Sequence, residues 1–178
     1  MSWRRYPEDL THYGFVSFDA VHRPYASVCS FATTTVTSER AQPLALWTGA
    51  GGAVKVWWNG EEVHQDEAYR HPSFDRHAVV VGAHRGANRL VVKNCVTDTS
   101  WGFYLRLTDP SGQTPRGVTV SAESMPPAVG TGSGVARLPR APETPLATLE
   151  AAAAGASPKA EALFHLARFL DYTGSDDP

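Results

Sequence analysis

Two adjacent tryptophans, Trp57 and Trp58, are the side chains of this sequence best suited to contact a ligand. They end the β-rich run Ala53–Trp58, in which apolar residues alternate with Lys55 and Trp57. Because successive side chains of a strand point to opposite sides, we expect Trp58 in the core and Trp57 with Lys55 on the outer face. An indole exposed there could stack on the apolar face of a sugar ring.

A second alternating run, residues 102–107, places Tyr104 and Arg106 opposite its apolar residues. If Trp57 and Tyr104 share one accessible face, they form a platform for a sugar. The alternative is that an N-terminal aromatic segment or a C-terminal helical hairpin covers them. The candidate ligand-binding residues are therefore Trp57, Tyr104, Lys55 and Arg106, and we predict no catalytic residue.

Other groups of polar residues could support metal binding or hydrolysis. Imidazoles bind zinc or copper, but the spacing of the clustered histidines matches no ligand motif, so we interpret them as solvent-facing. These are His64, His71, His77 and His84. Four neighbouring acids could supply the acid and base of a glycosidase, although a solvated hairpin face explains them better. They are Glu61, Glu62, Asp66 and Glu67.

No metal ligand and no cofactor is predicted, apart from a low-ranked structural calcium. Asp75, Asp98 and Asp109 lie near predicted strand ends, where related modules hold calcium with loop oxygens. Carboxylates are common in loops, so these three are not a specific signal.

Composition narrows the possible partners. The 178 residues include 16 Lys and Arg against 18 Asp and Glu, a net charge of -2, without a cluster of basic residues. Nucleic acid is therefore not an expected partner. No apolar stretch approaches the ~20 residues that cross a bilayer, so a membrane is not expected either.

Residues 1–5 lack signal-peptide character, so we expect an intracellular chain or a segment whose targeting sequence lies elsewhere. Cys29 and Cys95 leave the redox compartment undecided. They lie in predicted strands and could pair if those strands were neighbours, but we expect free thiols, because isolated cysteines are often buried thiols.

The remaining pattern predicts successive antiparallel strands. Asn59-Gly60 suits a type I′ turn, so Ala53–Trp58 and the residues after it form a hairpin. Gly86-Ala87-Asn88 turns the chain again. Further strands are expected at residues 15–18, at an edge, and at 25–37, 78–81, 90–93 and 117–122. Residues 44–47 form another, ended by a turn at 49–52.

Two of these motifs resemble the galactose-binding-like β-sandwich modules, the jelly rolls found beside glycoside hydrolase domains. VKVWWNG at residues 54–60 is similar to the family's "vxvNG" hairpin. GANRLVVK at 86–93 resembles its "GxNxLxVK" strand start, and GFYLRL at 102–107 the strand that follows. The resemblance covers roughly residues 25–123. Asn94 and His84 depart from it, since the family usually has apolar residues there. It implies a two-sheet sandwich, carbohydrate binding and an extracytoplasmic location.

The C-terminal third changes character. Glycines and prolines make residues 124–143 a linker. Thr144 then caps a helix that begins at Pro145 and stops near Gly155. A second helix, ended by Gly174, carries an apolar stripe and loosely resembles the start of a tetratricopeptide-like repeat. The stripe consists of Leu163, Leu166, Ala167 and Leu170. Either this hairpin packs on the sandwich or the parent chain continues beyond it.

The predicted fold class is therefore mainly β: an antiparallel jelly-roll β-sandwich in residues 1–123, a linker at 124–143 and an α-helical hairpin at 144–178. The expected function is that of a non-catalytic module that binds carbohydrate or positions neighbouring domains of a larger protein. One alternative is a structural or protein-interaction domain with helical repeats. Another is a glycan-acting hydrolase that uses the acidic segment at 64–75. Possible partners are a carbohydrate, another protein or further domains of the parent chain.

Overall fold

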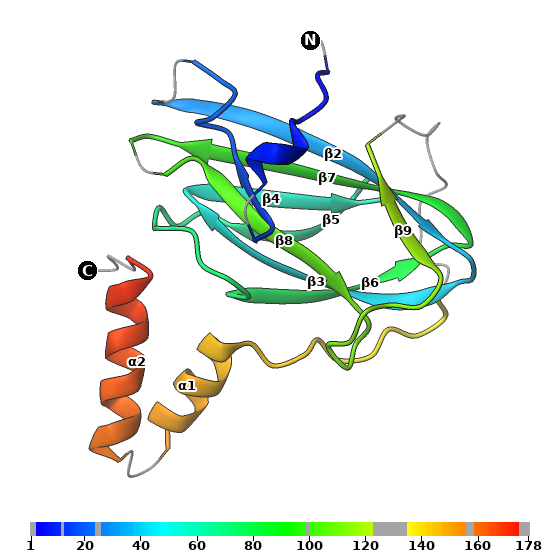
Figure 1. Cartoon of the computed structure of the whole chain (residues 1–178). Coiled ribbons are helices and arrows are strands. Elements are labelled where there is room, and N and C mark those ends of the chain that lie inside the picture. The colour runs from blue at the N-terminus through cyan, green and yellow to red at the C-terminus, as the bar shows by residue number, and fades with distance from the viewer. Residues whose placement is uncertain are drawn as a thin grey trace.

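The computed structural model describes residues 3–11, 13–23, 26–98, 100–122, 135–155 and 159–174. A single 3-10 turn, Glu8–Leu10, precedes the strands. The strands are β1 (Phe15–Ser17), β2 (Val28–Ser38), β3 (Gln42–Gly51), β4 (Ala53–Trp58), β5 (Glu61–Asp66), β6 (His77–Ala83), β7 (Gly86–Val96), β8 (Gly102–Thr108) and β9 (Val118–Ser121). They form a four-stranded sheet, β1-β8-β3-β6, packed on a five-stranded sheet, β5-β4-β7-β2-β9 (Figure 1).

The order of the strands is that of a jelly roll. Among the described strands from β1 to β8, only the consecutive pair β4 and β5 lies in one sheet, and every other connection crosses between sheets. All pairings are antiparallel, as in a double Greek key. The predicted fold class, a mainly β antiparallel sandwich followed by two helices, is confirmed.

One predicted turn is wrong. The turn expected at residues 49–52 is strand as far as Gly51, and the chain turns at Gly52, where φ is +74°. Side chains at Gly49 and Gly51 would collide with the backbone carbonyls of Ser73 and Ser100. Glycine in this strand therefore lets two loops lie directly on the backbone of β3.

The core fills the space between the sheets and confirms the predicted alternation in β4. Trp58 is 4% exposed, and its indole Nε1 donates to the carbonyl of Gly82 at 2.9 Å. The residues packed with it come from both inner faces. They include Val36, Leu44, Leu46, Val56, Val81, Leu90, Trp101 and Phe103. Trp57 and Lys55 lie on the outer face, partly exposed, as expected.

The two motifs that carry the family resemblance meet through their asparagines. Asn59 follows β4, and Asn88 lies at the start of β7; both are buried. The side-chain amide of Asn59 donates to Asn88 Oδ1 at 3.0 Å, and Asn59 Oδ1 accepts from the Arg89 amide at 2.8 Å. These bonds tie the β4–β5 hairpin to the start of β7, so both asparagines have structural roles.

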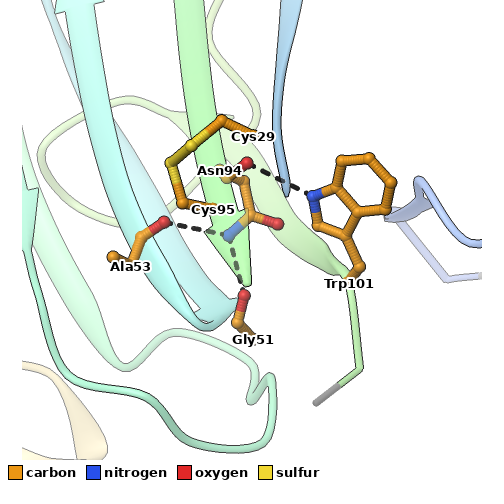
Figure 2. The surroundings of a disulfide bond; sticks show 6 residues. All are labelled: Cys29, Gly51, Ala53, Asn94, Cys95 and Trp101. Atoms are coloured by element: carbon orange, nitrogen blue, oxygen red, sulfur yellow. Dashed lines mark hydrogen bonds between the residues drawn. A yellow bond between two sulfur atoms is a disulfide. The ribbon is translucent and has the colours of Figure 1, made fainter. Parts of the chain in front are cut away.

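A third buried asparagine lies beside a disulfide (Figure 2). Asn94 Nδ2 donates to the carbonyls of Gly51 at 2.7 Å and Ala53 at 3.1 Å, across the bend between β3 and β4. Its departure from the family pattern thus has a physical reason, because this bend needs a buried donor. The disulfide joins Cys29 to Cys95, which face each other across β2 and β7, so the expectation of two free thiols is wrong.

The helical hairpin forms as predicted and contacts the sandwich. Thr144 Oγ1 accepts from the Ala147 amide at 3.1 Å and caps α1 (Pro145–Ala153). The second helix, α2 (Ala160–Tyr172), ends beside the loop before β6, where Arg76 Nη1 donates to Thr173 Oγ1 at 2.9 Å. Arg76 and Thr173 are both buried. The end of α2 is therefore anchored on the four-stranded side of the sandwich.

The predicted linker is only partly described. Residues 123–134 lie outside the described part of the chain. Further on, Ala141 packs against a small cluster on the outer face of the four-stranded sheet that includes Ala45, Trp47 and Val80. Neither helix in the described residues combines the length and apolar character needed to cross a membrane.

Candidate functional site

The outer face of the five-stranded sheet brings two of the four predicted site residues together. Lys55 and Trp57 alternate with the core residues of β4. Strand pairing places Lys93 of β7 opposite Lys55, and Phe31 of β2 opposite Lys93. One row of side chains across the sheet therefore runs from Lys55 through Lys93 to Phe31, with Trp57 in the next row.

A hollow of about 320 Å³ opens at this face, next to the disulfide. Its polar walls offer ammonium groups as donors and carboxylates as acceptors, and the ring of Tyr69 is 48% exposed. The lining residues are Ala53, Val54, Lys55, Asp66, Glu67, Tyr69, Lys93 and Cys95. We define the hollow together with Trp57 and Phe31 as the lysine face.

The other two predicted residues lie on the opposite side of the sandwich. Tyr104 and Arg106 belong to β8, which is in the four-stranded sheet. The Tyr104 ring lies between Phe15 and Phe74, with ring centroids 4.8 and 3.9 Å away. A joint platform of Trp57 and Tyr104 does not form, because β4 and β8 expose their outer side chains on opposite faces.

Arg106 is bound within the protein. It makes two hydrogen bonds to the carboxylate of Asp75, at 2.8 and 2.6 Å, and its guanidinium lies 4.5 Å from the centroid of the Trp47 ring. The hydrogen bond to Asp75 raises the pKa of Arg106. This pair fastens the loop before β6 to the four-stranded sheet, which gives Arg106 a structural contact.

A second hollow, of about 280 Å³, lies near β9 and is mainly aliphatic. It is lined by Thr34, Leu90, Leu105, Arg106, Leu107, Thr114, Pro115, Val118 and Val120. Its walls hold few groups that could bond to the hydroxyls of a sugar, so the lysine face fits a polar ligand better.

A cluster of ionisable groups supports one wall of the lysine face. Asp66, at the end of β5, accepts from Arg70 at 2.8 Å and lies 2.9 Å from His77 Nε2. Burial raises the pKa of Asp66, but the hydrogen bonds from His77 and the Ala68 amide and the charge of Arg70 outweigh it. The pKa falls to about 2. Asp66 is therefore ionised at neutral pH, which makes it unsuitable as a general acid.

His64 completes this cluster and is neutral at pH 7. Its ring lies 4.8 Å from that of His77, and its Nε2 is buried without a hydrogen-bond partner. Burial, followed by the charge of His77, lowers the pKa of His64 to about 4, although Asp66 acts in the opposite direction. His64 and His77 are strand residues in mutual contact, so the interpretation of these two as solvent-facing loop histidines is wrong.

We predict that the protein loses stability as the pH falls from about 6.5 to 4. Because the folded pKa of His64 is about 4, below its ordinary 6.5, the unfolded chain binds more protons across this interval. The contribution of neutral His64 to stability is fully present above pH 6.5 and is lost as the pH falls toward 4. Asp66 adds a loss at lower pH, between its ordinary 3.8 and about 2. Thermal unfolding measured at several pH values across this range gives the slope of stability against pH.

His64→Phe keeps a ring beside His77 and removes the titrating group, so it should flatten the slope between pH 6.5 and 4. His165→Gln, at an exposed position on α2, is the matched control and should leave the slope as in the wild type. An unchanged slope in His64→Phe would show that other groups cause the acid sensitivity.

The three aspartates considered for calcium are not brought together as a site. Asp75 binds Arg106, and Asp109 accepts from Ser111 and the Gln113 amide within its own loop. Across the described ranges, no group of three or more His, Cys, Asp or Glu side chains is placed to hold a metal ion.

Sequence reasoning missed Tyr69, Lys93 and Phe31. Lys93 and Phe31 alternate with core residues and could have been assigned to an outer face, but only the strand register shows that they adjoin Lys55. Tyr69 belongs to an irregular segment that carries no periodic signal. No protein-family model, no curated protein and no solved structure matches this chain.

Proposed function

We propose that the protein is a non-catalytic module that binds carbohydrate on the lysine face. The observation that carries the proposal is the position of Trp57 and Lys55 on one exposed sheet face, beside a hollow that holds the exposed ring of Tyr69. A saccharide presents both apolar ring faces and hydroxyl groups. It needs aromatic surfaces together with donors and acceptors, and the lysine face supplies all three.

The construction of the face also supports binding. Lys55, Trp57 and Lys93 project from paired strands, so the backbone beneath them is ordered before a ligand arrives. The hollow of about 320 Å³ lies within the usual range of small-ligand sites, roughly 300–1,000 Å³. A weak, reversible association is expected from so open a surface.

The same geometry favours binding over hydrolysis. A glycosidase needs one protonated carboxyl group and a second carboxylate across the scissile bond. Asp66 is held ionised by Arg70 and His77, and the Glu62 carboxylate lies 3.5 Å from Lys55 Nζ. The disulfide between Cys29 and Cys95 is compatible with an extracytoplasmic setting, in which many such modules work.

A second candidate function, docking to a neighbouring domain, is favoured by α2. Leu163 and Phe164 of this helix are exposed, although its C-terminal end is anchored on the sandwich. Exposed apolar side chains on an anchored helix suit a domain-positioning role. The two functions are compatible in one accessory module.

Glycan-array binding tests the proposal. Trp57→Ala and Tyr69→Ala should each weaken binding about tenfold, because each removes a stacking surface, and a factor of ten is about 1.4 kcal/mol. Phe74→Ala is the matched control: it removes an aromatic ring that is 52% exposed on the opposite side of the sandwich, and it should leave binding unchanged. Absence of binding to every glycan would reject the proposal and favour the docking function.

A further inference from the structure

The lysine face carries an unfavourable pair of charges. Lys55 and Lys93 are direct cross-strand partners on β4 and β7, and both project from the outer face. Like charges directly opposite each other in an antiparallel pair destabilise it. An anion bound between these lysines would remove that repulsion, so the free protein has a site at which negative charge is favoured.

Nearby carboxylates neutralise the two lysines only in part. The ammonium of Lys93 lies 5.8 Å from the centroid of the Phe31 ring, and no carboxylate of a described residue is within ion-pairing distance of it. Within the described part of the chain, Lys55 has one ion-pair partner, Glu62 at 3.5 Å, and both side chains are more than a third exposed. Exposed pairs of this kind contribute little to stability, because water and salt screen them.

The acids in the wall of the hollow have other partners. Asp66 is bound by Arg70 and His77. Glu67 accepts a hydrogen bond from the side-chain amide of Gln65 at 2.7 Å, which orients the carboxylate without neutralising it. The arrangement thus separates two kinds of group: acids held by their own neighbours along one wall, and lysines whose charge remains available to a ligand.

We propose that the lysine face selects acidic saccharides, those that carry a carboxylate or a sulfate group. This inference rests on the proposed carbohydrate-binding function and adds the ligand class. The anionic group binds Lys55 and Lys93, and its sugar ring packs on Tyr69 in the hollow. A longer saccharide also reaches Trp57, which lies two residues along β4 from Lys55 and so about 7 Å away.

Two matched pairs of ligands test the selection by titration calorimetry. One pair is tetragalacturonic acid and its fully methyl-esterified form, which differ in carboxylate charge. The other is a keratan sulfate tetrasaccharide and its desulfated form, which differ in sulfate. We expect the acidic member of at least one pair to bind about tenfold more tightly. Its affinity should also fall with added salt, because the charges are exposed. Equal affinity within both pairs would overturn the inference.

Lysine variants connect the selection to this face. Lys55→Gln and Lys93→Gln should each weaken binding of the acidic ligand about tenfold and binding of the neutral ligand much less, because glutamine keeps a hydrogen-bond donor but loses the charge. Lys159→Gln, at the exposed start of α2, is the control and should change neither. Equal losses for acidic and neutral ligands would reject the role of the lysine charge while leaving carbohydrate binding intact. Binding to no glycan at all would reject the proposed function itself.

Discussion

Trp58→Ala should lower the free energy of unfolding by about 3–5 kcal/mol. The indole is 4% exposed and packs against core residues of both sheets. Its removal loses apolar burial and leaves a cavity that the rigid sheets cannot close. It also leaves the buried carbonyl of Gly82 without the indole donor.

The adjacent residue provides the matched control. Trp57→Ala removes the same side chain from the outer face of the same strand and should cost about 1 kcal/mol or less. Chemical denaturation of both variants, monitored by circular dichroism, gives the comparison. Equal destabilisation would show that the assignment of inner and outer faces in β4 is wrong.

Asn88→Ala should lower the free energy of unfolding as much as Trp58→Ala does, by about 3–5 kcal/mol, although it removes only a small polar side chain. The Asn88 amide donates to the carbonyls of Val36 at 3.3 Å, His84 at 3.0 Å and Gly86 at 3.1 Å. Its Oδ1 accepts from the Asn59 side chain and the His84 amide. Each buried group left without a partner costs about 1–3 kcal/mol.

A double-mutant cycle separates this network from general loss of packing. Asn88→Ala combined with Asn59→Ala should be non-additive by about 1 kcal/mol, because the two side chains share a hydrogen bond. Asn88→Ala combined with Asn94→Ala should be additive, since the two positions are six residues apart, about 20 Å along β7. Full additivity of the first pair would show that the Asn59–Asn88 bond contributes nothing to stability.

Local patterns were sufficient to predict much of the fold. The alternation in β4 indicated that Trp58 is buried, Asn59-Gly60 indicated the hairpin, and Thr144 before Pro145 indicated the start of α1. Each of these features depends on residues close together in the chain. Strand periodicity, turn conformation and helix capping act over a few residues, so a single sequence carries them.

The candidate site depended on long-range pairing, which no local pattern contains. Alternation showed that Trp57 and Tyr104 face away from the core but not that β4 and β8 belong to different sheets. In the same way, nothing near Lys55 in the sequence indicates that Lys93 lies opposite it. The disulfide follows the same rule, because Cys29 and Cys95 meet through the register of β2 with β7.

The polar departures from the family pattern became interpretable only in three dimensions. Asn94 stands where an apolar residue was expected, yet it is fully buried because the bend at Gly51 and Ala53 presents two carbonyls to its amide. His84 likewise departs from the pattern, and its backbone amide and carbonyl are both bonded by Asn88. At Asn94 the carbonyls of the bend thus account for the polar side chain, whereas the bonds at position 84 use only backbone atoms and do not explain its imidazole.

The indole resonances of the protein offer the most direct measurement of carbohydrate binding on the lysine face. Trp57 is partly exposed there, whereas Trp47, Trp58 and Trp101 are buried. In a ¹⁵N-labelled sample titrated with a mixture of neutral and acidic tetrasaccharides, the Trp57 Nε1 resonance should shift and saturate while the three buried indoles stay in place. Unchanged indole resonances at saturating saccharide, or shifts confined to Trp47 on the opposite sheet, would contradict binding at this face.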